Sequence, residues 1–130
     1  MEHYEFLSQV KQLANLASLE DADRAVFATL ETLSERITGG EDGNLAAQLP
    51  TEIGNYLRKS MQAGEGFNLD EFFRRVSRRE GAPVDLAAEH ARAVLLVLQQ
   101  AVAPGLIEKV KDQLPDEFDG LFLRGGVQSQ

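Results

Sequence analysis

Apolar residues along this chain recur at the three- and four-residue spacing of an α-helix. Between residues 4 and 17 they fall within an arc of about 120° at 100° per residue, and polar residues occupy the other side. The arc consists of Phe6, Leu7, Val10, Leu13, Ala14 and Ala17. No segment shows the sustained apolar–polar alternation of a half-buried strand. The pattern predicts an all-α fold in which these apolar residues face the core.

Capping residues and helix breakers predict where the other helices begin and end. Ser18 with Asp21 is typical of a capping box, and Asn68 caps a later helix with Glu71 three residues on. We expect the helix that follows Ser18 to end at Gly39-Gly40, where left-handed backbone is accessible. Further helices are expected at 44–49, 51–61, 68–80, 85–102, 106–114 and 115–122. The segment 94–98 is apolar all round, which predicts a helix at the centre of the molecule or at a subunit interface.

Three motifs occur twice in the same order, which indicates an internal duplication. Glu5-Phe6-Leu7-x-x-Val10 returns as Glu71-Phe72-Phe73-x-x-Val76, and Gln48-Leu49-Pro50 returns as Gln113-Leu114-Pro115. Between them, the apolar pattern of 28–37 returns at 93–102. It recurs at the same distance along the chain as the Gln-Leu-Pro motif, and the first motif recurs at a distance one residue longer. Such self-similarity at a fixed period is the signature of repeated structural units.

The duplication predicts a single helical domain, 1–130, in the form of a compact bundle of two tandem repeats. Repeat 1 spans about 5–62, a hinge 63–67, and repeat 2 about 68–122, with a disordered tail at 123–130. Each repeat is expected to hold two longer and two short helices, and a pseudo-twofold axis is expected to relate the repeats.

Composition excludes several classes of site. The 130 residues fit one domain, and the absence of cysteine excludes disulfides and thiolate metal sites. The longest apolar run, 93–98, falls far short of the roughly 18 residues that span a bilayer. The net charge of −8 and the pI of 4.7 disfavour nucleic acid and anionic membranes as partners. We expect a soluble, cytoplasmic protein.

With these motifs the chain resembles a bacterial family of unknown function, DUF2267. The resemblance covers about 4–122 and rests on Phe6-Leu7-x-x-Val10, on 45–50, on 71–76 and on 113–122. Ile53-Gly54 departs from the family pattern, in which a leucine and a larger polar residue are typical. Membership implies an all-helical fold and a bacterial origin, and it brings no catalytic residues.

One helix carries a cluster of arginines that forms the best candidate site. Within 68–80, four arginines span about 140° of arc on the side opposite the apolar residues. These are Arg74, Arg75, Arg78 and Arg79. Their guanidinium groups suit carboxylates, which indicates an acidic protein partner, or less readily phosphates. The simpler interpretation is a solvated face, with Arg75 paired to Glu71 and further partners from the acidic first repeat.

The two Gln-Leu-Pro motifs are interpreted as structural. Leu49 and Leu114 are expected to be core anchors, and Pro50 and Pro115 to separate consecutive helices. The glutamines are expected to bond freed carbonyls near each break, although a pair of ligand-binding turns is the alternative.

No catalytic, cofactor or metal site is expected. The histidines lack a ligand-spaced partner, and His90 is interpreted as a core-edge residue with a hydrogen bond. Carboxylates spaced four apart, such as Glu31 and Glu35, are expected to face water.

Two hypotheses for function follow from these observations. The first is a non-catalytic helical protein-interaction module that binds an acidic protein partner or forms a homo-oligomer. The second is a binder of a small molecule or a lipid-like ligand, or an enzyme of unrecognised type, with a cleft between the two repeats.

Overall fold

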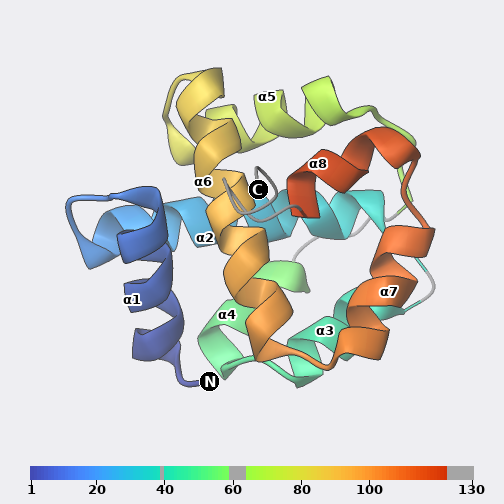
Figure 1. Cartoon of the computed structure of the whole chain (residues 1–130), viewed down its shortest axis with the longest axis horizontal. Helices are drawn as coiled ribbons and strands as arrows, with labels where there is room; N and C mark the ends of the chain where they lie inside the picture. Colours follow the sequence, from blue (N-terminus) through green and yellow to red (C-terminus); the bar gives the residue numbers. More distant parts are fainter. Residues whose placement is uncertain (39, 59–63, 123–130) are drawn as a thin grey trace, which may run out of the picture.

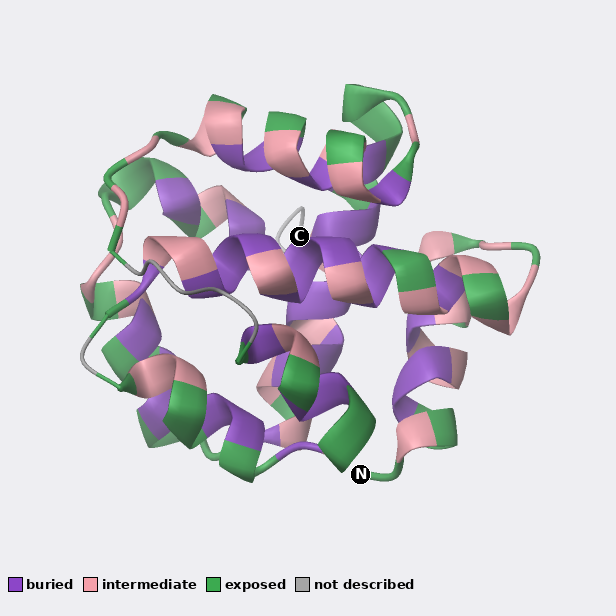
Figure 2. Cartoon of the chain, turned by 180° about the vertical axis from the view of Figure 1, so that it is seen from behind, coloured by how far each residue is buried: buried purple, intermediate pink, exposed green. Residues whose placement is uncertain are grey.

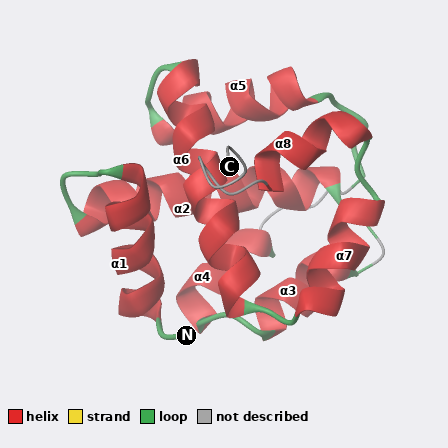
Figure 3. Ribbon diagram, in the orientation of Figure 1, coloured by secondary structure: helices red, strands yellow, loops and turns green. Residues whose placement is uncertain are grey.

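The computed structural model describes residues 1–38, 40–58 and 64–122, and in these residues the chain is helical with no strand (Figure 3). The prediction of an all-α fold is confirmed. The elements are α1 His3–Ala14, α2 Leu19–Arg36, α3 Glu41–Ala47, α4 Thr51–Leu57, α5 Leu69–Glu80, α6 Val84–Ala101, α7 Pro104–Asp112, the 3-10 helix η1 Asp116–Phe118, and α8 Asp119–Phe122. Among the described residues, no helix combines the length and the apolar character needed to cross a bilayer.

Both predicted N-terminal caps form. The Asp21 N–H donates to Ser18 Oγ at 3.0 Å, and the Glu71 N–H donates to Asn68 Oδ1 at 2.9 Å. Each cap satisfies a backbone donor that has no partner within its helix.

The predicted end of the second helix at Gly39-Gly40 is wrong. Helix α2 ends at Arg36, and the fully buried Ile37 is extended, with φ −103° and ψ 157°. This extended backbone, which suits a β-branched residue, ends the helix before the glycines are reached. Gly40 adopts a positive φ of 79° and precedes α3 instead, and Gly39 lies outside the described residues. So do 59–61 of the helix expected at 51–61, the first residue of the expected hinge, and the expected tail at 123–130.

The order of helix lengths recurs along the chain. Helices α1 and α5 each have 12 residues, and α2 and α6 each have 18. Their contacts are reciprocal: α1 packs on α2 and on α6, whereas α5 packs on α6 and on α2. Figure 1 shows α6 crossing in front of α2 at the middle of the molecule. The pseudo-twofold axis itself stays a prediction.

The two long helices form the centre of the core. Val94, Leu95, Val97 and Leu98 are buried, and Leu96 is half-buried, so the apolar segment of α6 lies inside the molecule as expected. Seen from behind, α2 carries buried or half-buried residues over most of its length (Figure 2).

The glutamines of the Gln-Leu-Pro motifs bond across the molecule rather than near their own helix break. The Ala103 N–H donates to Gln48 Oε1 at 2.8 Å, and the Thr38 N–H donates to Gln113 Oε1 at 2.6 Å. Thr38 and Ala103 are separated by the same offset as the two glutamines, so they are matching positions of the two repeats. Each glutamine therefore bonds the segment that follows the long helix of the other repeat. Leu49 is buried, Leu114 packs partly buried against the core, and Pro50 and Pro115 precede α4 and η1.

Gly54 allows α4 to approach α3 closely. A Cβ atom at this position would lie 2.8 Å from the Ala46 carbonyl oxygen and 3.3 Å from the Ala46 Cα. These are backbone atoms, so the neighbouring helix has to move to make room.

We expect Gly54→Ala to destabilise the protein by about 1 kcal/mol, because overpacking of about 1–3 kcal/mol exceeds a helix-propensity gain of about 1 kcal/mol. Urea denaturation monitored by circular dichroism measures the change. Gly43→Ala is the matched control, since its Cβ meets nothing within 4 Å and the exposed helical position should gain stability. A Gly54→Ala variant as stable as Gly43→Ala would contradict the steric argument.

Candidate functional site

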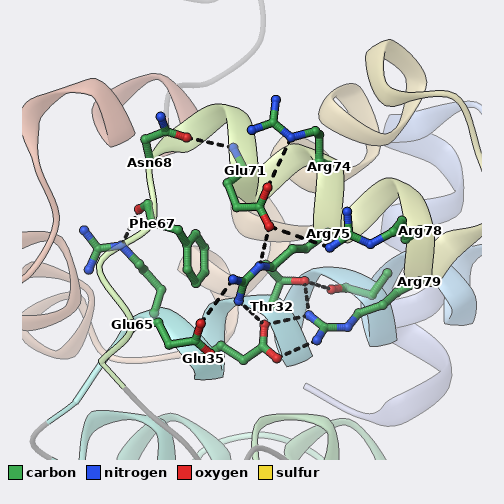
Figure 4. A network of polar contacts seen from close by, with 12 residues as sticks. Thr32, Glu35, Glu65, Phe67, Asn68, Glu71, Arg74, Arg75, Arg78 and Arg79 are labelled. Atoms are coloured by element: carbon green, nitrogen blue, oxygen red, sulfur yellow. Dashed lines mark hydrogen bonds and ion pairs between the residues drawn. The ribbon is translucent and has the colours of Figure 1, made fainter.

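The predicted arginine cluster on α5 divides into two pairs with different surroundings. Figure 4 shows Arg75 and Arg79 turned toward Glu35 of α2, whereas Arg74 and Arg78 are turned away from it.

Arg75 is largely buried and bonds three carboxylates. Its Nε donates to Glu71 at 2.8 Å, its Nη1 to Glu35 at 3.0 Å and its Nη2 to Glu65 at 3.1 Å. Its guanidinium group also lies 3.9 Å from the centre of the Phe67 ring, a cation–π contact. Each of the three nitrogens of Arg75 thus donates to a carboxylate within the molecule.

Arg79 extends this network to α2. Its Nη1 donates to Thr32 Oγ1 at 2.7 Å and to Glu35 Oε1 at 2.9 Å, and its Nη2 donates to Glu35 Oε2 at 2.5 Å. The Glu35 side chain is only 16% exposed, and Arg79 Nε lies 4.0 Å from Glu31, which is also largely buried. The expectation that Glu31 and Glu35 face water is wrong, because arginines of another helix cover them.

The network holds its charges at neutral pH. Burial alone raises the pKa of Glu35, but hydrogen bonds from Arg79 and Arg75, with their coulombic attraction, outweigh burial and lower it. Burial lowers the pKa of Arg75, but its bonds to Glu71, Glu65 and Glu35 outweigh that effect and raise it. The contact between α5 and α2 is therefore ionic as well as apolar.

Arg74 and Arg78 are the members of the cluster that face solvent. Their side chains are 54% and 65% exposed, and both approach Glu71, at 3.1 Å and 3.6 Å. Exposed pairs of this kind contribute at most about 1 kcal/mol, so both guanidinium groups are available to a partner. A partner-binding role for the four arginines stays a prediction.

Helices α1 and α6 contact each other, and Figure 1 shows where they lie. Side chains of both helices line a groove of about 330 Å³. Its lining consists of Leu13, Glu89, Arg92, Ala93 and Leu96. Leu13 is 51% exposed, so its predicted core position is wrong. Helix α1 buries Phe6, Leu7 and Val10 but ends at Ala14, which leaves Leu13 at the edge of its contact with α6 and the exposed Ala17 beyond the helix.

The groove differs in chemistry from its counterpart in the other half. When the two repeats are aligned, Leu13 takes the position of Arg79, with the same offset as the matching glutamates Glu5 and Glu71. Glu31 takes the position of Leu96, with the same offset as the two Gln-Leu-Pro motifs. The contact of α5 with α2 thus carries an ion pair where the contact of α1 with α6 carries two leucines. The leucines leave an apolar groove on the surface.

Glu80 and His90 form a buried acid–base pair between α5 and α6. His90 Nδ1 is hydrogen-bonded to Glu80 Oε2, whereas Glu80 Oε1 is buried without a hydrogen-bond partner. Burial raises the pKa of Glu80 and outweighs the lowering effect of His90 and Arg24. A cavity of about 250 Å³ lies beside the pair. The hydrogen bond expected for His90 is confirmed, but its partner, ten residues earlier on another helix, gave no sequence signal by motif spacing.

Metal ligands do not gather in the part of the chain that the structure describes, where no group of three or more acidic or histidine side chains is placed to hold an ion. A further shallow cavity of about 480 Å³ lies where α3 and α7 meet, bordered by Gln48 and Lys109 among others. Like the groove between α1 and α6 and the cavity beside Glu80 and His90, it is lined by residues of both repeats.

A family model described as "Uncharacterized conserved protein (DUF2267)" matches residues 3–121. No curated protein matches the chain.

Proposed function

Since the chain belongs to the DUF2267 family of uncharacterized conserved proteins, we propose from its geometry that it is a non-catalytic helical protein-interaction module. The groove between α1 and α6 carries this proposal. Leu13 is half-exposed beside Leu96, and Leu86, on the same side of α6, is 43% exposed. Single exposed leucines are common on proteins, whereas leucines gathered along a groove mark a contact surface.

Burial of these leucines supplies the driving force for binding. Each Å² of apolar surface removed from water contributes about 25 cal/mol. The exposed Arg74 and Arg78 on α5 are available for an acidic protein partner in addition. The cytoplasmic location and bacterial origin expected from the sequence belong to the same proposal.

The proposal assigns no catalytic role to the Glu80–His90 pair. The cavity beside Glu80 and His90 is lined otherwise by Leu16, Asp21, Arg24, Gly81 and Ala82. This lining offers neither a hydroxyl nor an amine as a nucleophile for the acid–base pair to activate.

A small-molecule or lipid-like ligand binder is the second candidate. The cavity between α3 and α7, of about 480 Å³, falls within the range of about 300–1,000 Å³ that is usual for ligand pockets. A melting temperature raised by the small-molecule fraction of a cell extract, and not by its protein fraction, would favour this candidate over the interaction module.

We expect Leu13→Glu to abolish protein capture by the tagged chain, because a carboxylate in the groove would have to lose its hydration on binding. The measurement is quantitative mass spectrometry of proteins retained from native lysate. Tyr4→Glu is the matched control, since Tyr4 is also an exposed residue of α1 but points about 180° away from Leu13. Capture that is equal for wild type and Leu13→Glu, or a wild type that binds neither another protein nor a second copy of this chain, would refute the proposal.

A further inference from the structure

We propose that the groove between α1 and α6 binds a second copy of this chain, with the two α6 helices antiparallel across a twofold axis. This inference rests on the proposed interaction function and names its partner. Helix α6 presents Leu86 and Glu89 to solvent on the side of the groove.

One side of α6 carries the exposed Leu86 and Glu89, the half-buried Leu96 and the buried Ala93, and their spacing is the same in both directions along the helix. Leu86 and Leu96 each lie five residues from Ala91, and Glu89 and Ala93 each lie two residues from it. All four fall within an arc of about 80° on the helix. A twofold contact requires that residue i meets j while j meets i. An axis at the level of Ala91 places Leu86 of each copy on Leu96 of the other.

The charges along the groove are also self-complementary. The antiparallel register brings Glu89 of one copy beside Ala93 and Arg92 of the other, so two opposite-charge contacts form at once. The groove itself carries one acidic and one basic residue, in a chain whose net charge is −8. Two such chains repel each other over most of their surface, and this locally neutral, apolar strip is suited to close approach.

The other half of the molecule shows how the same position is closed without a partner. There, Arg79 and Glu31 occupy the places of Leu13 and Leu96, and Arg79 bonds Glu35 within the chain. Ionic side chains suit a contact that faces water, whereas paired leucines suit one that a second molecule covers.

Sedimentation of the full chain over a range of concentrations tests the inference. We expect wild type and Tyr4→Glu to form a species of twice the chain mass of 14.3 kDa. Leu13→Glu should be monomeric, and Glu89→Arg should weaken the dimer about tenfold or more, because it sets two arginines against each other across the axis. The exchange Glu89→Arg with Arg92→Glu should restore the dimer. Arg92 also contacts the Phe73 ring and the Gly120 carbonyl, so thermal melts must show that this variant folds.

Cross-linking tests the register without changing Arg92. The chain has no cysteine, so single variants report one contact each. Leu86→Cys mixed with Leu96→Cys should form disulfide-linked heterodimers on mild oxidation, because the two positions meet. Neither variant alone should cross-link. In a dimer of one variant, the two identical cysteines are separated by ten residues along the antiparallel helices, roughly 15 Å, which is beyond disulfide reach.

Failure of this inference is distinguishable from failure of the proposed function. A single species of 14.3 kDa at every concentration, or a dimer unaffected by Leu13→Glu and Glu89→Arg, would overturn the second-copy inference. If wild type stays monomeric and Leu13→Glu still abolishes capture of another protein, the interaction module stands. If both are absent, both ideas are rejected.

Discussion

Replacing Glu35 with alanine should lower the free energy of unfolding by about 3 kcal/mol. The change removes the carboxylate that accepts hydrogen bonds from both Arg75 and Arg79 and leaves two largely buried guanidinium groups short of an acceptor. Breaking a buried ion pair by removing one partner typically costs about 3–5 kcal/mol, and the residual exposure of Glu35 places the value at the lower end. Urea denaturation at pH 7 measures it.

Glu31→Ala is the matched control for this prediction. Glu31 lies one turn earlier on α2, with a similar exposure, but its described ion pair is a single contact of 4.0 Å to Arg79. We expect a loss below about 1 kcal/mol. Glu35→Gln should give an intermediate loss, since glutamine keeps one acceptor oxygen without the charge. Equal losses for Glu31→Ala and Glu35→Ala would show that Glu35 is not the centre of the network.

The contribution of Glu35 should also depend on pH. Its pKa in the folded protein lies below the ordinary 4.5, so the unfolded chain binds more protons as the pH falls. The stabilisation is therefore present above pH 4.5 and is lost as the pH falls through the lowered pKa. The stability difference between wild type and Glu35→Ala should shrink over that acid range.

Local sequence signals predicted the helices because the physics behind them is local. The caps at Ser18 and Asn68 are bonds over three residues, and the apolar stripe of α5 is a property of one helix. The same reasoning failed at Leu13, whose place on the stripe of α1 is apolar but whose burial depends on where α6 lies. Periodicity identifies a face, and only packing decides how much of it is covered.

The charged residues were harder to predict because their partners lie far along the chain. Arg79 and Glu35 are separated by 44 residues, and His90 and Glu80 by ten across a turn. The duplication itself indicates where both pairs lie. When the repeats are aligned, Arg79 matches Leu13, and Glu80 and His90 match Ala14 and Ala25. Such exchanges of polar for apolar residues mark the positions at which the two repeats make different contacts.

His90→Ala alone should destabilise the protein by about 3 kcal/mol. Glu80 would keep its buried position, and the described bond to its Oε2 would be lost while Oε1 already lacks a partner. A buried carboxylate stripped of its partner carries its full desolvation penalty. Chemical denaturation near pH 7, where the Glu80 carboxyl of the unfolded chain is ionised, measures the loss.

The double variant Glu80→Ala with His90→Ala should recover most of this loss and come within about 1 kcal/mol of wild type. It introduces the alanines that repeat 1 carries at these positions, and replacing a buried ionic pair by apolar residues is often neutral, although the cavity beside it grows.

The pKa of Glu80 is raised in the folded protein, so its contribution to stability is present below pH 4.5 and is lost as the pH rises through that raised pKa. The stability of the double variant relative to wild type should therefore increase as the pH rises from 4.5. A double variant no more stable than His90→Ala would show that the two side chains act independently, and that packing of the imidazole rather than its bond to Glu80 stabilises the contact of α5 with α6.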